Sequence, residues 1–128
     1  GENLDQAVRL GLKPEGGFAE NPYAFTEADL LRGKALYQSF CAICHGVRGE
    51  GDGRAIPLGV PKPRSYHDPA VRDQPEGYFY FAATNGFGRM LPYKSRIPER
   101  ERWLIAHYIK RCLLSEACPE EVVHAEVH

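Results

Sequence analysis

The strongest constraint on this chain is the pentapeptide Cys41-Ala42-Ile43-Cys44-His45. Its two thiols lie about one helical turn apart, a spacing at which both can add to the vinyl groups of one haem, and the adjacent imidazole can bind the iron. The sequence therefore predicts one haem c, covalently attached through Cys41 and Cys44, with His45 as an iron ligand.

A C-x-x-C pair is also typical of half a zinc site or of a redox dithiol. A zinc site usually takes its other ligands from a second closely spaced pair, but the remaining cysteines, Cys112 and Cys118, lie further apart near the other end of the chain. A mixed zinc site and a dithiol therefore stay as alternatives. Outside the cytoplasm we expect Cys112 and Cys118 to form a disulfide, with two free thiols as the alternative.

With 128 residues the chain is long enough for a single domain. It holds 16 Lys and Arg against 17 Asp and Glu, without the basic excess typical of nucleic-acid-binding proteins. No apolar stretch is long enough to cross a bilayer, and the chain opens without a basic and then apolar leader. We expect a soluble mature form or fragment whose export leader or lipid anchor was removed or lies outside this sequence. Because bacteria attach such a haem outside the cytoplasm, we expect a periplasmic protein, free or held at the outer face of the inner membrane.

The sequence divides into an N-terminal extension over 1–25, a domain over 26–118 and a polar C-terminal tail over 119–128. Glycines and a proline interrupt the extension after its first ten residues. Its aromatic residues, among them Phe18 and Tyr23, are too apolar for a simple tether, so we expect the extension to pack on the domain.

Two helices are expected to cross and close the domain. Thr26 and Asp29 form a capping-box pattern that begins a helix over 27–41. Gly33 inside this helix costs roughly 0.5 to 1 kcal/mol relative to alanine, which indicates close approach of another backbone. The partner is a helix over 99–114, with Ile105 and Tyr108 over Gly33 and Tyr37. Between them, we expect a short helix after Asp68 and a longer one from about Pro75 to Asn85.

Over residues 26–114 the chain resembles class I cytochromes c. The resemblance rests on the pentapeptide, the helix with Gly33 and Tyr37, the loop Gly46-Val47-Arg48-Gly49-Glu50-Gly51-Asp52-Gly53, the segment 86–92 around Met90, and the helix with Trp103 and Tyr108. The segment Asn21-Pro22-Tyr23-Ala24-Phe25 and the glycine-rich loop are similar, more narrowly, to small monohaem cytochromes of bacterial respiratory chains, including those associated with alternative complex III. The resemblance implies an all-α class I cytochrome c fold, in which three to five helices wrap around one covalently bound haem, with an N-terminal extension.

The resemblance also implies that Met90 is the second axial ligand of the iron. A lone methionine usually fills a gap in a core, but Met90 lies on a glycine-rich loop directly before Leu91-Pro92, as in the axial-ligand loop of the family. The rival ligands are the histidines outside the pentapeptide, namely His67, His107, His124 and His128. His67 is the main competitor, because the others belong to the last helix or the polar tail.

Other residues are expected to support the cofactor. By resemblance, the backbone carbonyl of Pro57 or of a neighbour accepts the second imidazole N–H of His45 and fixes the ring. Side chains that can donate hydrogen bonds to the haem propionates are Arg54, Arg89 and Tyr93, with Arg64, Arg96 and Tyr66 as further candidates. A solvated surface charge is the alternative for each arginine.

Ligation by His and Met fills both axial positions and raises the reduction potential. The sequence therefore predicts a one-electron carrier and not an enzyme; the alternative is a haem protein with a labile sixth ligand, acting as a gas sensor or weak peroxidase. The resemblance implies a monomer that takes electrons from a quinol:cytochrome c oxidoreductase, such as alternative complex III, and passes them to a haem-copper oxygen reductase. Basic residues are expected around the haem edge where partners dock, namely Lys34, Arg48, Lys62, Arg89 and Lys94.

Overall fold

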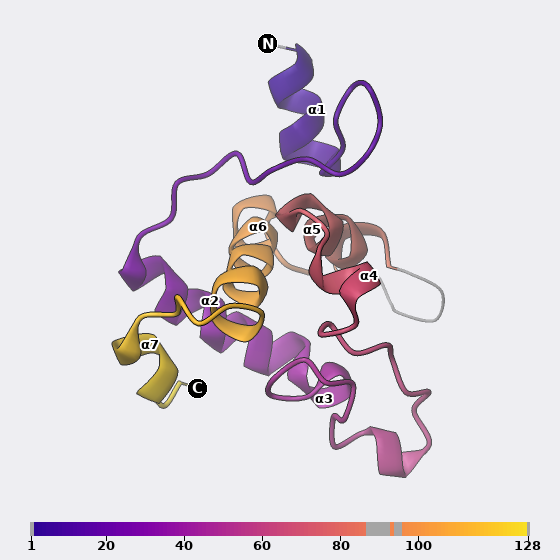
Figure 1. The fold of residues 1–128 in the computed structure, drawn as a ribbon, viewed down its shortest axis with the longest axis vertical. Coiled ribbons are helices and arrows are strands. Elements are labelled where there is room, and N and C mark those ends of the chain that lie inside the picture. Colours follow the sequence, from indigo (N-terminus) through magenta and orange to yellow (C-terminus); the bar gives the residue numbers. More distant parts are fainter. Residues whose placement is uncertain (1, 87–92, 94–95, 128) are drawn as a thin grey trace.

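The computed structural model describes residues 2–86, 93 and 96–127 (Figure 1). Its elements are α1 (Glu2–Leu10), α2 (Glu27–Phe40), α3 (Ala42–His45), the 3-10 turn η1 (Ile56–Leu58), α4 (Pro69–Arg72), α5 (Glu76–Asn85), α6 (Glu99–Tyr108), the π turn η2 (Ile109–Leu113) and α7 (Glu120–His124). Within these ranges the only β-structure is an isolated bridge between Leu12 and Phe18. The all-α class expected from the sequence is confirmed.

The start of α2 is fixed by the capping box that the sequence predicts. The backbone N–H of Asp29 donates to the Thr26 hydroxyl (3.2 Å), and the backbone N–H of Thr26 donates to the Asp29 carboxylate (2.9 Å). This backbone hydrogen bond lowers the pKa of the Asp29 carboxyl. From this cap α2 runs to Phe40 and delivers Cys41 at its end.

The helices α2 and α6 cross at Gly33, in the centre of the core. A Cβ atom on Gly33 would lie 3.2 Å from Leu104 Cγ and 3.2 Å from Tyr108 Cβ, so the close approach that was expected is confirmed. Beside it, the rings of Tyr37 and Tyr108 are 5.6 Å apart. Of the expected pair, Tyr108 lies beside both Gly33 and Tyr37, whereas the other atoms nearest to Gly33 belong to Leu104 and not to Ile105. The pairing of the two helices depends on their crossing geometry, which leaves both Leu104 and Ile105 buried.

The N-terminal extension packs on the domain, as expected. The Tyr80 hydroxyl of α5 donates to the carbonyl of Arg9 (2.9 Å), and the indole N–H of Trp103 donates to the carbonyl of Val8 (2.8 Å). Further along, the backbone N–H of Gly77 donates to the carbonyl of Ala19 (2.8 Å). In Figure 1 α1 lies at the top of the molecule, next to α5 and α6. The extension therefore covers the end of the domain opposite α3.

The C-terminal segment also belongs to the folded core, although the sequence suggested a polar tail. Val122 of α7 is buried, and Lys34 Nζ donates to the carbonyls of Val122 (2.7 Å), Val123 (3.0 Å) and Ala125 (2.7 Å). Lys34 is only 8% exposed, and burial lowers its pKa. Its expected place on a docking rim is therefore wrong. Just before α7, Cys112 and Cys118 form the expected disulfide.

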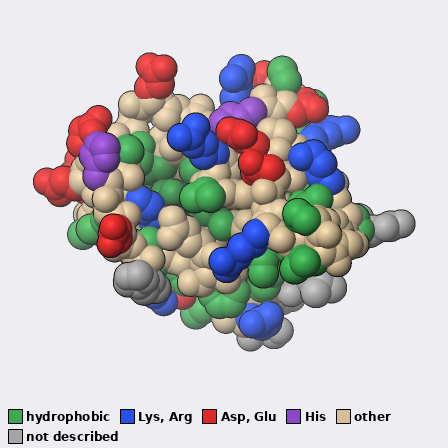
Figure 2. Space-filling view, turned by 90° about the horizontal axis from the view of Figure 1, so that it is seen from below, with side chains coloured by type: hydrophobic (Ala, Val, Ile, Leu, Met, Phe, Trp, Pro, Cys, Tyr) green, Lys and Arg blue, Asp and Glu red, His purple; other side chains and the backbone are tan. Residues whose placement is uncertain are grey.

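The lower side of the molecule carries α3 and η1 and exposes several large apolar side chains. These are Ile43, Val47, Leu58 and Val60. Figure 2 looks at this side from below and shows apolar side chains across the middle of the face, with Lys and Arg and also Asp, Glu and His side chains among and around them. In the described part of the chain, no helix has the length and apolar character that crossing a membrane requires.

Candidate haem-binding site

The turn between α2 and α3 brings the two thiols and the imidazole of the pentapeptide together. Cys41 ends α2 and begins α3, and the backbone N–H of His45 donates to its carbonyl (2.9 Å). Both Cys41 and Cys44 are free thiols; Cys41 is buried and Cys44 is half-buried. Burial, followed by the charge of Cys44, raises the pKa of the Cys41 thiol to about 12. Two thiols and an imidazole thus lie on one turn of backbone.

The imidazole of His45 is neutral, and one of its nitrogens has no hydrogen-bond partner in the described part of the chain. Burial lowers its pKa to about 4, so the ring is neutral at neutral pH, which is the form that binds metals. Its Nδ1 is buried and bonds to no atom of the described residues. The contact expected with the carbonyl of Pro57 is not formed: Pro57 is exposed on η1. The hydrogen bond from the N–H of Ala55 to the carbonyl of Ile43 (3.0 Å) directs the chain to the outer side of α3.

The glycine-rich loop after His45 folds tightly back against α3. Gly51 has a φ of +80°, and its N–H donates to the carbonyl of His45 (2.8 Å). At Gly53 a Cβ atom would collide with the carbonyl of Ile43, so only glycine permits this approach. The tight turn expected here is confirmed.

Two tyrosine hydroxyls brace the backbone on either side of the pentapeptide. Tyr37 donates to the carbonyl of Gly46 (2.7 Å), and Tyr93 donates to the carbonyl of Phe40 (3.1 Å). Burial raises the pKa of both phenols, which therefore remain donors. From the sequence, Tyr37 was expected in the core and Tyr93 as a hydrogen-bond donor to the haem propionates. Neither hydrogen bond could be predicted from the sequence, because each acceptor is a backbone carbonyl, a group that every residue has.

The ring of Tyr66 lies flat against the imidazole of His45. The two ring centroids are 4.8 Å apart and the planes differ by 17°. Tyr66 also makes an edge-to-face contact with the buried Phe79 of α5, with ring centroids 5.4 Å apart and planes at 88°. The sequence pointed to Tyr66 only as a propionate candidate, and nothing in the residues 64–85 indicated a contact with His45.

The donor set fits a covalently attached haem better than the zinc alternative. Cys112 and Cys118 are joined in a disulfide and are not available as thiolate ligands beside Cys41 and Cys44. No cluster of three or more His, Cys, Asp or Glu side chains that could hold a metal ion occurs in the described residues. Two free thiols next to a neutral imidazole are the donor set that covalent haem attachment requires.

Comparison with known families places this site in a known context. The family model described as cytochrome c oxidase, cbb3-type, subunit III matches residues 28–109, more than half of the chain. The chain belongs to this cytochrome c family. Membership implies covalent haem c and electron transfer, which agrees with the thiols and imidazole at the start of α3. No curated protein matches the sequence significantly.

Solved structures share the fold of this c-type cytochrome. A chain of the reducing HAO-like protein complex from Kuenenia stuttgartiensis is 28% identical, with a TM-score of 0.56 over 80% of this chain and 46% of that chain. The cytochrome thus spans less than half the length of that relative. A protein described as a c-type cytochrome is 22% identical, with a TM-score of 0.50 over 61% of this chain and 93% of that chain.

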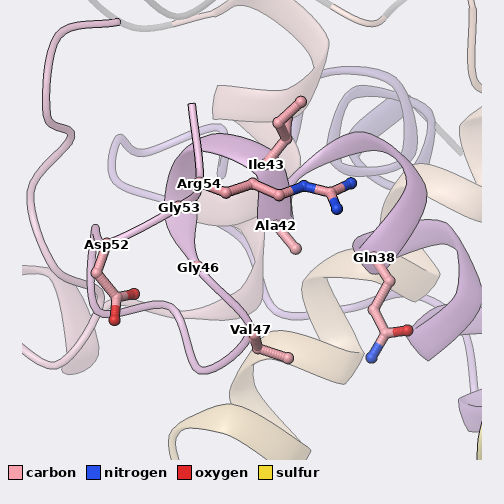
Figure 3. A pocket seen from close by; sticks show the side chains of 8 residues that line it. All are labelled: Gln38, Ala42, Ile43, Gly46, Val47, Asp52, Gly53 and Arg54. Atoms are coloured by element: carbon pink, nitrogen blue, oxygen red, sulfur yellow. The ribbon is translucent and has the colours of Figure 1, made fainter. Parts of the chain in front are cut away.

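A cavity of about 440 Å³ adjoins the outer side of α3 in this cytochrome (Figure 3). Its walls come from Gln38, Ala42, Ile43, Gly46, Val47, Asp52, Gly53 and Arg54. It is lined by the two residues between the cysteines and not by the cysteines or His45. In the view of Figure 3, Arg54 extends past Ile43 and Ala42 toward Gln38. The structure therefore places Arg54, a predicted propionate donor, beside the attachment turn.

Several predicted residues of the cytochrome are not brought to the site by described contacts. Met90 and Arg89 lie outside the described residues. The rival ligand His67 donates through Nε2 to the carbonyl of Arg48 (2.8 Å). The remaining rivals with described side chains pair with carboxylates: His107 with Glu76 at 3.0 Å, and His124 with Glu120 at 2.9 Å.

Proposed function

We propose that this c-type cytochrome carries single electrons in a bacterial respiratory chain, from a quinol-oxidising complex to a haem-copper oxygen reductase. The observation that supports this best is the meeting of two free thiols and a neutral imidazole on the α2–α3 turn of a cytochrome c domain. The acceptor is supported by the family description, which names a cbb3-type oxidase subunit. The donor, for which alternative complex III is our candidate, and the periplasmic location rest on the sequence resemblance.

Each residue of the turn has a separate task in this proposal. Cys41 and Cys44 form the two thioether links, and His45 binds the iron through its neutral imidazole. Met90 would supply the second iron ligand, a proposal that rests on its sequence context. A haem held by these residues would supply one-electron transfer between ferric and ferrous iron. The protein keeps His45 neutral by burial and holds its backbone through Tyr37 and the glycine-rich loop.

The exposed apolar side chains around α3 are our candidate for the docking surface. Ile43 lies between the two cysteines and is 45% exposed, and Val47 of the following loop is 64% exposed. Redox partners usually meet through small and short-lived interfaces, often below about 1,200 Å². Arg48 and Lys62, two of the basic residues expected on a docking rim, are exposed, and they lie close in sequence to the residues of this surface. Lys34, in contrast, is buried.

The ligand proposal is tested with two variants of the haem-loaded protein, Met90→Ala and His67→Ala. We expect Met90→Ala to lower the reduction potential and to open the iron to carbon monoxide, because the soft thioether is lost. His67→Ala should keep the potential and the carbon monoxide behaviour of the parent. If His67→Ala opens the iron and Met90→Ala does not, the ligand assignment is wrong. If the parent itself binds carbon monoxide readily, a sensor or peroxidase replaces the carrier.

The docking proposal is tested by electron transfer to a purified cbb3-type oxidase. A charge placed in the apolar surface by Ile43→Glu or Val47→Glu should slow the second-order reaction at an unchanged reduction potential. The matched control is Val123→Glu, because Val123 is 49% exposed but lies on α7, which is separate from α3. Equal rates for all three variants would argue against this surface, and no reaction of the parent would argue against this acceptor.

A further inference from the structure

We propose that Tyr66 is a positioning residue for His45, and that its ring fixes the rotation of the imidazole in place of a hydrogen bond. The inference rests on the proposed function only in taking His45 as the iron ligand.

The contact itself has the geometry of a ring stack. The centroids of Tyr66 and His45 are 4.8 Å apart with an angle of 17° between the planes. Rotation of the imidazole about its Cβ–Cγ bond would drive the edge of the ring into the face of Tyr66. A flat neighbour at this distance therefore restricts that rotation, because overlap of packed atoms is costly.

Tyr66 is itself held from two further directions. Its ring meets Phe79 edge-on at 5.4 Å, and Phe79 is 4% exposed in the core. Its backbone N–H donates to the carbonyl of Gly49 (2.8 Å). Gly49 has a φ of +74°, and a Cβ atom there would lie 2.5 Å from Cδ2 of Tyr66. The glycine-rich loop thus leaves the space that the Tyr66 ring needs beside His45.

The need for such a device follows from the second nitrogen of the imidazole. A histidine that binds a metal almost always donates its other N–H to a carboxylate, carbonyl or water, which orients the ring. The buried Nδ1 of His45 has no partner among the described residues, and Pro57 lies away from it on η1. The flat contact with Tyr66 is the described interaction that restrains this ring.

The test uses the haem-loaded, oxidised protein and reads the orientation of the imidazole directly. The orientation of an axial imidazole changes the electronic anisotropy of low-spin ferric iron, which is measured as the g values in electron paramagnetic resonance and as the haem methyl shifts in NMR. We expect Tyr66→Leu to shift the largest g value and to change the order of the methyl shifts. Tyr66→Phe keeps the ring and should leave both unchanged. Gly49→Ala should act like Tyr66→Leu, because its Cβ displaces the Tyr66 ring.

Tyr23→Leu is the matched control, since Tyr23 is also partly buried and stacks on another ring, Phe25, at 5.4 Å and 24°. It should leave the spectra unchanged. Spectra of Tyr66→Leu that superimpose on the parent would overturn the inference while the proposed function stands. Equal shifts in Tyr66→Phe and Tyr66→Leu would also overturn it, because the hydroxyl would then be responsible. If Tyr66→Leu fails to retain haem, Gly49→Ala decides. A parent without a histidine-bound haem would contradict the proposed function itself.

Discussion

The crossing of α2 with α6 and the turn that starts α3 lie at the middle and the end of the same helix, yet they differ in whether their buried groups have protein partners. At the crossing, the close contacts are between protein atoms: Gly33 fits against Leu104 and Tyr108. About two helical turns further along the chain, Cys41 is a buried free thiol, and the Nδ1 of His45 beyond it is buried without a partner.

This difference indicates which part of the chain is built for another molecule. A buried polar group that lacks a hydrogen bond costs about 1–3 kcal/mol, and folded proteins satisfy nearly all such groups. His107 Nε2 on α6 is another buried side-chain nitrogen without a partner among the described residues, but only at the α3 turn does such an imidazole stand beside two free thiols, a combination that fits a covalently bound haem. The family membership supplies that group, a covalent haem c.

We expect covalent haem attachment to depend on the two thiols of the pentapeptide. In a host that attaches haem c, Cys41→Ser/Cys44→Ser should yield a chain with no covalent haem, because no thioether can form. Intact mass and haem staining after denaturing electrophoresis measure this directly. Cys112→Ser/Cys118→Ser is the control and should keep one haem per chain, since these cysteines form a disulfide away from the turn. Covalent haem in the first double variant would show that attachment uses other residues.

The close packing of α2 against α6 is tested by adding side-chain volume at Gly33. Gly33→Val should lower the free energy of unfolding by about 2 kcal/mol, because the new methyl groups meet the backbone of Leu104 and the Cβ of Tyr108. Denaturant unfolding followed by circular dichroism measures the loss. Ala28→Val, at an exposed position of the same helix, should cost less than about 1 kcal/mol. Equal costs at the two positions would mean that the crossing is not closely packed.

The hydrogen bonds from Lys34 to the C-terminal segment are expected to contribute only a little to the free energy of unfolding. Lys34→Met removes the donor to three carbonyls of the C-terminal segment but also the cost of burying an ammonium group, so we expect a net loss of about 1 kcal/mol. Faster amide hydrogen exchange in residues 119–127 is the local signature. Lys13→Met, at an exposed site, should leave that exchange unchanged. Unchanged amide hydrogen exchange in Lys34→Met would mean that the hydrogen bonds from Lys34 do not stabilise the position of α7.

The features that could be predicted from the sequence are those with a local signal. The pentapeptide carries its chemistry in five consecutive residues, the Thr26 cap needs only Asp29, and Gly33 in a helix already indicates a close neighbour. The contacts of Lys34 could not be predicted, because its partners are carbonyls 88, 89 and 91 residues away.

The orientation of His45 escaped prediction for a related reason. The path of the loop from Gly46 to Gly53 depends on glycine conformations that no side chain specifies. Along this path Pro57 is exposed on η1, and Gly49 leaves space for Tyr66 beside His45. Met90, which the sequence singles out by context, stays a prediction because it lies outside the described residues.

We propose that the protein binds a haem whose iron has two protein ligands, so that no coordination site is open and the haem serves electron transfer. The most direct test is the optical spectrum of the purified haem-loaded protein, oxidised and reduced, with and without carbon monoxide. We predict a low-spin c-type spectrum, a weak far-red band from sulfur ligation in the ferric form, and no change with carbon monoxide. A high-spin spectrum or ready binding of carbon monoxide would contradict the claim, and a protein without haem would return Cys41 and Cys44 to thiol or zinc chemistry.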